Sequence, residues 1–183
     1  MAGQVRILLI SGSTRGGSTN TAALRTARAV APAPVAARLY EGLAGLPAFN
    51  PDDDHEPLPP AVAELRQEIA AAGAVLFCTP EYAGTLPGSF KNLLDWTVGG
   101  VQMSAKPVAW INVAAEGRGN GAHDSLATVL GYVGAHVVES ACRRIPLART
   151  AVGPDGQVAD PDFRAALTGV LQAILTDLSP PAG

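Results

Sequence analysis

The sequence predicts an α/β domain in three layers, with a parallel sheet of five strands between two layers of helices. The 183 residues are enough to bury the core of one domain without disulfides or metals. Short apolar runs alternate along the chain with segments of helical spacing, and this alternation is typical of parallel strands joined by crossover helices. We find no internal repeat and no linker, so residues 1–183 are interpreted as a single domain.

Five short runs rich in β-branched and other apolar residues are the predicted strands. Their apolar residues follow one another with little alternation, which indicates strands that are covered on both faces. Right-handed crossover connections leave few arrangements of five parallel strands, and they favour the order 2-1-3-4-5 of flavodoxin-like proteins. The five runs are residues 5–10, 35–40, 75–79, 108–113 and 137–143.

Helices are predicted between these strands and after the last one. An Ala-rich helix follows Asn20, and four further segments place apolar residues three or four apart, which puts them on one helix face. The last helix follows Asp160 as N-cap and has Pro161 at its first position. Residues 179–183 are predicted to be a disordered tail. The apolar faces consist of Val62, Leu65 and Ile69, then Phe90, Leu93, Leu94 and Val98, then Leu126, Val129, Leu130 and Val133, and finally Phe163, Leu167, Val170, Leu171, Ile174 and Leu178.

The composition argues against several classes of partner. With 16 acidic and 13 basic side chains the formal charge is −3, whereas nucleic-acid binding normally needs a basic surface. The closest basic residues, Arg143, Arg144 and Arg149, are interpreted as a solvated face. No apolar run approaches the ~18 residues of a membrane span, and the first residues lack a signal-peptide pattern, so we expect a soluble cytoplasmic protein without membrane partners. Cys78 and Cys142 form no C-x-x-C pair and are expected to be reduced, buried thiols. No metal site is expected.

The stretch SGSTRGGSTN at residues 11–20 joins the first strand to the first helix and is the first candidate binding site. Its backbone N–H groups and the positive end of the following helix dipole favour an anion. Gly12 and Gly17 have the spacing of a nucleoside-triphosphate loop, but Ser18 replaces the required Lys, and Thr14 breaks the dinucleotide pattern. A single phosphomonoester, such as that of FMN, is the predicted ligand, with a merely flexible turn as the alternative. The residues expected to bind it are Ser11, Ser13, Arg15, Ser18, Thr19 and Asn20.

The loop after the third strand adds a second motif, because residues 80–96 read PEYAGTLPGSFKNLLDW. Together the two loops resemble the NADPH-dependent FMN reductase family, the flavodoxin-like group that includes bacterial chromate, quinone and azo-dye reductases. The resemblance runs from about residue 5 to about residue 135. The family motif G-S-x-R-x-x-S-x-N is matched by Gly12, Ser13, Arg15, Ser18 and Asn20. The motif P-E-Y-N-x-x-x-P-G-x-x-K-N-x-x-D-W is matched by Pro80, Glu81, Tyr82, Pro87, Gly88, Lys91, Asn92, Asp95 and Trp96.

The resemblance implies that this second loop borders the flavin ring and that a third loop, after the fourth strand, lies beside it. Glu81 either contacts the ligand or bonds to backbone and holds the turn in shape. Ala83 departs from the motif, which has Asn at this position, so we expect flavin binding to be weakened or retuned rather than lost. The expected ring contacts are Pro80, Glu81, Tyr82, Ala83, Gly84 and Thr85 in the second loop and Glu116, Gly117, Arg118 and Gly119 in the third.

The implied function is that of an NAD(P)H-dependent oxidoreductase. Hydride passes from NADPH or NADH to bound FMN and then to a quinone, azo compound, chromate or similar small-molecule acceptor, and no catalytic side chain is expected because the flavin supplies the chemistry. Two alternatives stay open: a flavodoxin-type electron carrier, disfavoured by the charge of −3 and 5% aromatic content, and a flavin-free binder of a phosphate ligand. Arg15 and Arg118 are each candidates for the 2′-phosphate of NADPH. A homodimer or homotetramer is expected from the resemblance.

Overall fold

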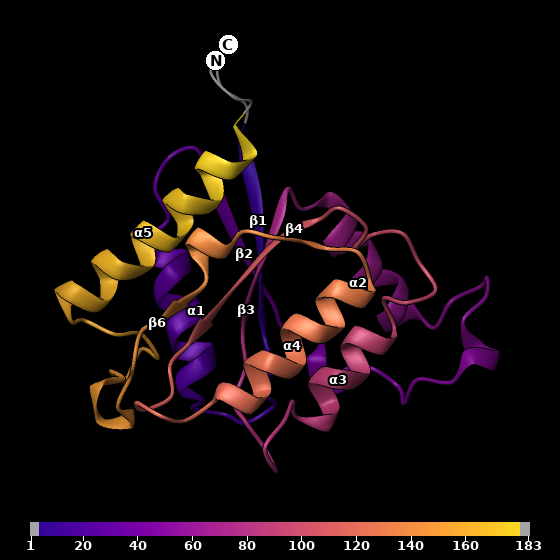
Figure 1. The fold of residues 1–183 in the computed structure, drawn as a ribbon, viewed down its shortest axis with the longest axis horizontal. Coiled ribbons are helices and arrows are strands. Elements are labelled where there is room, and N and C mark those ends of the chain that lie inside the picture. The colour runs from indigo at the N-terminus through magenta and orange to yellow at the C-terminus, as the bar shows by residue number, and fades with distance from the viewer. Residues whose placement is uncertain (1–3, 180–183) are drawn as a thin grey trace.

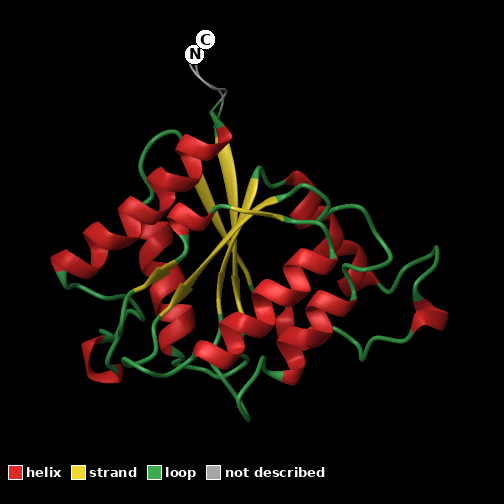
Figure 2. Cartoon of the chain, in the orientation of Figure 1, coloured by secondary structure: helices red, strands yellow, loops and turns green. Residues whose placement is uncertain are grey.

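The computed structural model describes residues 4–179 and shows a parallel sheet with helices on both faces (Figures 1 and 2). The strands pair in the order β2-β1-β3-β4-β5, and β6 also pairs with β4. The predicted strand order and three-layer class are therefore confirmed. Apart from Ser179, the predicted tail at 179–183 lies outside the described residues. The strands are β1 (Val5–Ser11), β2 (Val35–Tyr40), β3 (Ala74–Cys78), β4 (Pro107–Asn112), β5 (His136–Val137) and β6 (Arg143–Arg144).

The end of the sheet differs from the prediction of one strand over residues 137–143. There, β5 and β6 are two short strands separated by the 3-10 turn η3 (Glu139–Ala141). Val138 and Ala141 are both buried in the same hydrophobic cluster. Residues three apart lie on opposite faces of a strand but on the same side of a 3-10 turn, so the turn lets both side chains reach the core.

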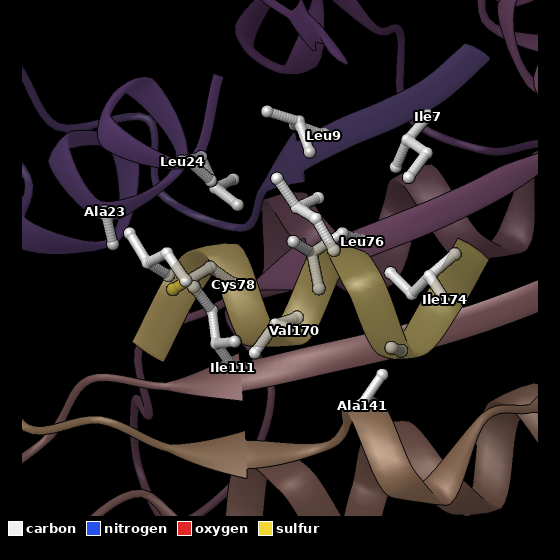
Figure 3. Close-up of a cluster of buried hydrophobic side chains, with 14 of the residues drawn as sticks. Ile7, Leu9, Ala23, Leu24, Leu76, Cys78, Ile111, Ala141, Val170 and Ile174 are labelled. Carbon is white, nitrogen blue, oxygen red and sulfur yellow. The ribbon is translucent and has the colours of Figure 1, made fainter. Parts of the chain in front are cut away.

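Five helices cover the two faces of the sheet, and two hydrophobic clusters hold the layers together. One cluster joins alternate residues of β1, such as Ile7 and Leu9, to Leu24 and Ile174 of the helices on that face (Figure 3). The intervening residues of β1, Leu8 and Ile10, belong to the other cluster. The first face carries α1 (Thr19–Ala29) and α5 (Pro161–Leu178), and the second carries α2 (Pro60–Ala71), α3 (Gly88–Asp95) and α4 (Asn120–Tyr132).

Two details of the helices test the sequence reasoning. The Asp160 carboxylate accepts a hydrogen bond from the Phe163 amide at 2.8 Å, with Pro161 at the first helical position, as predicted. Val98 was expected on the apolar face of α3, but α3 ends at Asp95 and Val98 is 63% exposed. Trp96, which directly follows α3, is fully buried instead. Within residues 4–179, no helix is both long and apolar enough to cross a membrane.

The strand order places three loops next to one another at one edge of the sheet. Because β1, β3 and β4 are neighbours and run in parallel, their carboxyl ends lie at the same edge, where open α/β sheets bind ligands. The first loop (residues 12–18) leads from β1 to α1, the second (79–87) from β3 to α3, and the third (113–119) from β4 to α4. These loops contain most of the residues singled out from the sequence.

Candidate functional site

The first and second loops are packed tightly together at Gly12. The Gly12 amide donates to the carbonyl of Cys78, the last residue of β3, at 2.9 Å. A Cβ atom at Gly12 would lie 2.2 Å from Oγ1 and 2.6 Å from Cβ of Thr79, and 3.0 Å from a ring carbon of Phe90. Contacts below 3.0 Å are not sustained without displacement, so only glycine fits here. Gly12 of the family motif therefore allows the first and second loops to pack closely together.

Side-chain hydroxyls of the first loop hold its backbone in shape. The Ser11 hydroxyl lies 2.8 Å from that of Thr21 and accepts from the Ser13 amide at 3.3 Å. The Ser13 hydroxyl accepts from the Arg15 amide at 3.3 Å. The Ser18 hydroxyl caps α1 by accepting from the Asn20 amide at 3.2 Å. Ser11 and Ser18 are both nearly buried, so much of their hydrogen-bonding capacity serves the loop itself.

The amides of the first loop are the main polar groups left over. Within the described part of the chain, no protein group accepts from the N–H of five residues, and these amides surround the positive end of α1. The first turn of α1 has no acidic side chain, and the Arg15 side chain is exposed. The arrangement therefore favours an anion with several acceptor oxygens. The five residues are Thr14, Gly16, Gly17, Ser18 and Thr19.

Pockets adjoin the first loop and the start of α1. One, of about 190 Å³, lies between the loop and the end of β2, beside Tyr40 and Glu41. Burial raises the pKa of Tyr40 to about 12, so its phenol stays protonated at neutral pH. The other, of about 260 Å³, is lined by the first turn of α1 and by the second and third loops, among them Asn20, Glu81 and Gly119. This second pocket is where the three predicted segments meet.

The second loop forms a tight two-residue turn. Tyr82 and Thr85 exchange backbone hydrogen bonds of 3.0 and 3.1 Å. The two central residues, Ala83 and Gly84, have positive φ angles of 51° and 77°, which is the signature of a type I′ turn. Asn-Gly is the preferred pair in such turns because Asn tolerates the left-handed region better than Ala does. The Asn of the family motif would therefore suit the backbone at position 83, and Ala83 is strained there.

The second loop is tied to the start of α4. The Glu81 carboxylate accepts from the Ala122 amide at 3.2 Å, and the hydroxyls of Thr85 and Ser125 lie 2.7 Å apart. A Cβ at Gly121 would lie 2.1 Å from the Gly84 carbonyl oxygen, so the turn rests directly on the helix. Of the two roles considered for Glu81, the structure shows the backbone contact. Tyr82 projects from the turn and is 54% exposed.

The third loop is organised by a polar residue that sequence reasoning missed. Asn112, the last residue of β4, accepts from the Ala114 amide at 3.0 Å and donates to the Arg118 carbonyl at 3.2 Å. Gly117 and Gly119 both have positive φ, of 73° and 80°. The signal in the sequence that could have identified Asn112 was a polar residue inside the otherwise apolar run of residues 108–113.

Buried groups near the site have altered acidity. Burial raises the pKa of the Cys78 thiol far above its ordinary range, and the thiol donates to the Asn20 side-chain oxygen at 3.2 Å, so Cys78 is not a reactive thiolate. His123, assigned no role from the sequence, is buried in the first turn of α4 and its Nδ1 donates to the Gly119 carbonyl. Burial lowers the pKa of His123, which keeps the ring neutral at pH 7.

Arg144 is exposed, as expected of the solvated basic face to which it was assigned. Its guanidinium also donates to carbonyls of the third loop, at 3.1 Å to Ala115 and 2.9 Å to Arg118, which the sequence did not indicate. The reason is topological, because β6 pairs with β4 with Asn112 opposite Arg144. This register places the Arg144 side chain beside the start of the third loop.

The helix α3 holds the connection between β2 and α2 against the site. Asn92 and Trp96 both donate to the Pro47 carbonyl at 2.8 Å, and the Asn92 oxygen accepts from the Phe49 amide at 2.7 Å. The Phe49 ring stands edge-on to Trp96 at 5.0 Å. Asn92 and Trp96 of the second motif thus hold residues 47–49 in place near the first loop. A pocket of about 580 Å³ lies between this segment and Thr14, and both Ala48 and Asn92 line it.

The residues present fit the FMN expected from the sequence. A phosphomonoester needs several donors around one point, and the unpaired amides of the first loop supply them. A flat ring needs backbone that can approach closely, and no other atom lies within 4 Å of a Cβ built at Gly84 or Gly117. The two requirements are met on adjoining loops at one edge of the sheet.

Comparison with known proteins agrees with this geometry. The family described as NADPH-dependent FMN reductase matches residues 5–148. An NAD(P)H-dependent FMN reductase of Pseudomonas aeruginosa is 33% identical over 95% of this chain and 95% of its own length. A quinone reductase of Escherichia coli is 33% identical over 52% of each chain. The solved structure of FerB, a flavoenzyme NAD(P)H:(acceptor) oxidoreductase from Paracoccus denitrificans, superimposes with a TM-score of 0.81 at 27% identity, over 95% of this chain and 97% of that one.

The two motifs, the strand order and the extent of these matches all indicate the same family. The chain belongs to the NADPH-dependent FMN reductase family.

Proposed function

We propose that this protein binds FMN at the three loops and uses it to transfer electrons from NAD(P)H to a small-molecule acceptor. The observation that carries the proposal is the group of unpaired amides in the first loop and at the start of α1, next to a pocket lined by the first turn of α1 and by the second and third loops. FMN, when bound, supplies the hydride chemistry. The protein's own residues bind it, orient it and control access to it.

Each loop has a separate task in this proposal. The amides of the first loop, with the Ser13 hydroxyl and Arg15, hold the phosphate. The turn at Tyr82 and Gly84 borders the ring, and Glu81 keeps that turn seated on α4. The amides of the third loop would face the pyrimidine edge of bound FMN, and as hydrogen-bond donors there they would favour the reduced state. No side chain is required to act as nucleophile or general base.

The acceptor belongs to the quinone and azo class in this proposal. Support comes from the names of relatives, which include quinone reductases and an NADPH azoreductase. Tyr82, more than half exposed at the tip of the second loop, is placed to contact whichever molecule lies over the ring. We further propose that Arg15 or Arg118 contacts the 2′-phosphate of NADPH, that the protein acts in the cytoplasm, and that it forms a homodimer or homotetramer.

Steady-state oxidation of NADPH and NADH tests the proposal. The purified protein, loaded with FMN, should oxidise NAD(P)H continuously with a quinone or an azo dye. A rate no greater than that of free FMN at the same concentration would overturn it, and a single turnover without continued oxidation would indicate an electron carrier instead.

A charge-matched pair of variants locates the activity at the first loop. Arg15→Gln should weaken FMN binding about tenfold, or about 1.4 kcal/mol, because a cation beside the phosphate is lost. Arg28→Gln removes the same charge from the last turn of α1, away from the loop, and should leave FMN binding unchanged. Equal effects of the two substitutions would contradict the placement of the phosphate.

A further inference from the structure

Arg144 contacts more of the third loop than any other side chain described. Its Nη1 donates to the carbonyls of Ala115 at 3.1 Å and Arg118 at 2.9 Å, with a longer contact of 3.4 Å to Ala114. Its Nη2 donates to the Asn120 side-chain oxygen. A planar guanidinium can serve several acceptors at once. One exposed side chain from β6 therefore connects both ends of the third loop and the first residue of α4.

The strand pairing explains why Arg144 reaches this loop and its neighbour does not. Residues Ile111 and Asn112 of β4 lie opposite Arg143 and Arg144, and the Ile145 amide donates to the Asn112 carbonyl at 2.9 Å. Successive side chains on a strand point to opposite faces. In the described structure no hydrogen bond or ion pair involves the Arg143 side chain, which makes this neighbour a matched control.

The contacts with Arg144 set the direction of the loop's amides. The peptide bonds concerned are trans, so each C=O and the N–H of the next residue point in opposite directions. With the carbonyls of Ala114, Ala115 and Arg118 turned toward the guanidinium, the N–H groups of Ala115, Glu116 and Gly119 point away from it. None of these three amides has an acceptor among the described residues.

One of these amides lies at the proposed ligand pocket. Gly119 and its neighbour Arg118 line the pocket of about 260 Å³ between the first turn of α1 and the second and third loops. Two glycines with positive φ, Gly117 and Gly119, leave the loop backbone with many accessible conformations. Asn112 holds the loop at Ala114 and Arg118, and Arg144 adds the side-chain contact at Ala115.

We propose that Arg144 is a positioning residue that holds the third loop with its amides directed at the pyrimidine edge of bound FMN. This inference rests on the proposed function. Preorganised donors stabilise developing charge because they need not reorient when it appears. Arg144 therefore favours reduced FMN over oxidised FMN without touching either, through the amides that it orients.

The test compares Arg144→Met with Arg143→Met, which remove the same charge from adjacent residues of β6. In FMN-free protein, hydrogen exchange of the Ala114 and Arg118 amides, which have acceptors within the loop, should accelerate at least tenfold in Arg144→Met and stay within twofold of the original protein in Arg143→Met. FMN affinity, measured by quenching of flavin fluorescence, should fall about tenfold in Arg144→Met only. The affinity for reduced FMN should fall more than the affinity for oxidised FMN. Each factor of ten between the two losses lowers the midpoint potential of bound FMN by about 30 mV.

Arg144→Lys separates charge from geometry. An ammonium group keeps the charge but does not reproduce the planar fork, so exchange should accelerate nearly as much as in Arg144→Met. Exchange, affinity and potential in Arg144→Met that match those of Arg143→Met would overturn the proposal, as would a Lys variant indistinguishable from the original protein. If the original protein binds no FMN, the proposed function fails, whereas the exchange experiment still reports whether Arg144 orders the loop.

Discussion

Replacing Gly12 by Ala tests the close approach of the first two loops. The added Cβ would lie 2.2 Å from Thr79 Oγ1 and 2.6 Å from Thr79 Cβ, whereas carbon atoms in ordinary contact are about 3.5–4.0 Å apart. Gly12 and Thr79 are both buried, so the loops must separate by about 1 Å. Overpacking of this kind costs about 1–3 kcal/mol. For a domain of this size that lowers the Tm by about 2–12 °C.

Thermal and urea unfolding of Gly12→Ala measure this cost, and Gly16→Ala is the control. Gly16 is in the same loop, does not have a positive φ, and a Cβ there meets no atom within 4 Å. Its replacement should change the free energy of unfolding by less than about 0.5 kcal/mol, or stabilise slightly. Equal stability of the two variants would refute the packing argument. Weaker FMN binding by Gly12→Ala would follow from the displaced loop.

Three further predictions concern the surroundings of the site. Ala83→Asn should raise the free energy of unfolding by about 0.5–1 kcal/mol, since Asn suits the left-handed position of a type I′ turn; unchanged urea midpoints would contradict the strain at Ala83. Trp96→Phe should accelerate exchange of the Phe49 amide, which bonds to Asn92, because the neighbouring hydrogen bond to the Pro47 carbonyl is lost; unchanged exchange would show that Asn92 suffices. His123 has a lowered pKa in the folded state, so the unfolded state binds more protons and stability should fall as the pH drops below about 6.5. His123→Asn should flatten this dependence in unfolding measured from pH 7 to 5, and an unaltered slope would assign it to other groups.

The strand order and the meeting of the three loops could be predicted from local patterns. The apolar runs and the spacing of helical residues define where strands and helices lie, and the handedness of crossovers then limits the order of strands. Because parallel strands end at one edge, three loops far apart in the sequence had to be neighbours. The cap at Asp160 was also visible, because Asp at this position bonds to the amide three residues ahead.

The contacts that hold the loops in shape could not be predicted in the same way. Arg144 reaches carbonyls 26 to 30 positions away, and Asn92 holds backbone at Pro47 and Phe49. Such contacts depend on the register of strands and on the path of long connections, neither of which leaves a local pattern. The same holds for β5 and β6, where burial of Val138 and Ala141 prevails over strand propensity.

The most direct test of the account is the binding of FMN and riboflavin to the same protein. The two ligands share the flat ring and differ in the phosphate, so their affinities isolate the first loop. If its unpaired amides and Arg15 hold a phosphomonoester, FMN should bind at one site per chain and about a hundredfold more tightly than riboflavin, a difference of about 2.7 kcal/mol. Equal affinities for the two, or no binding of FMN, would contradict the central claim.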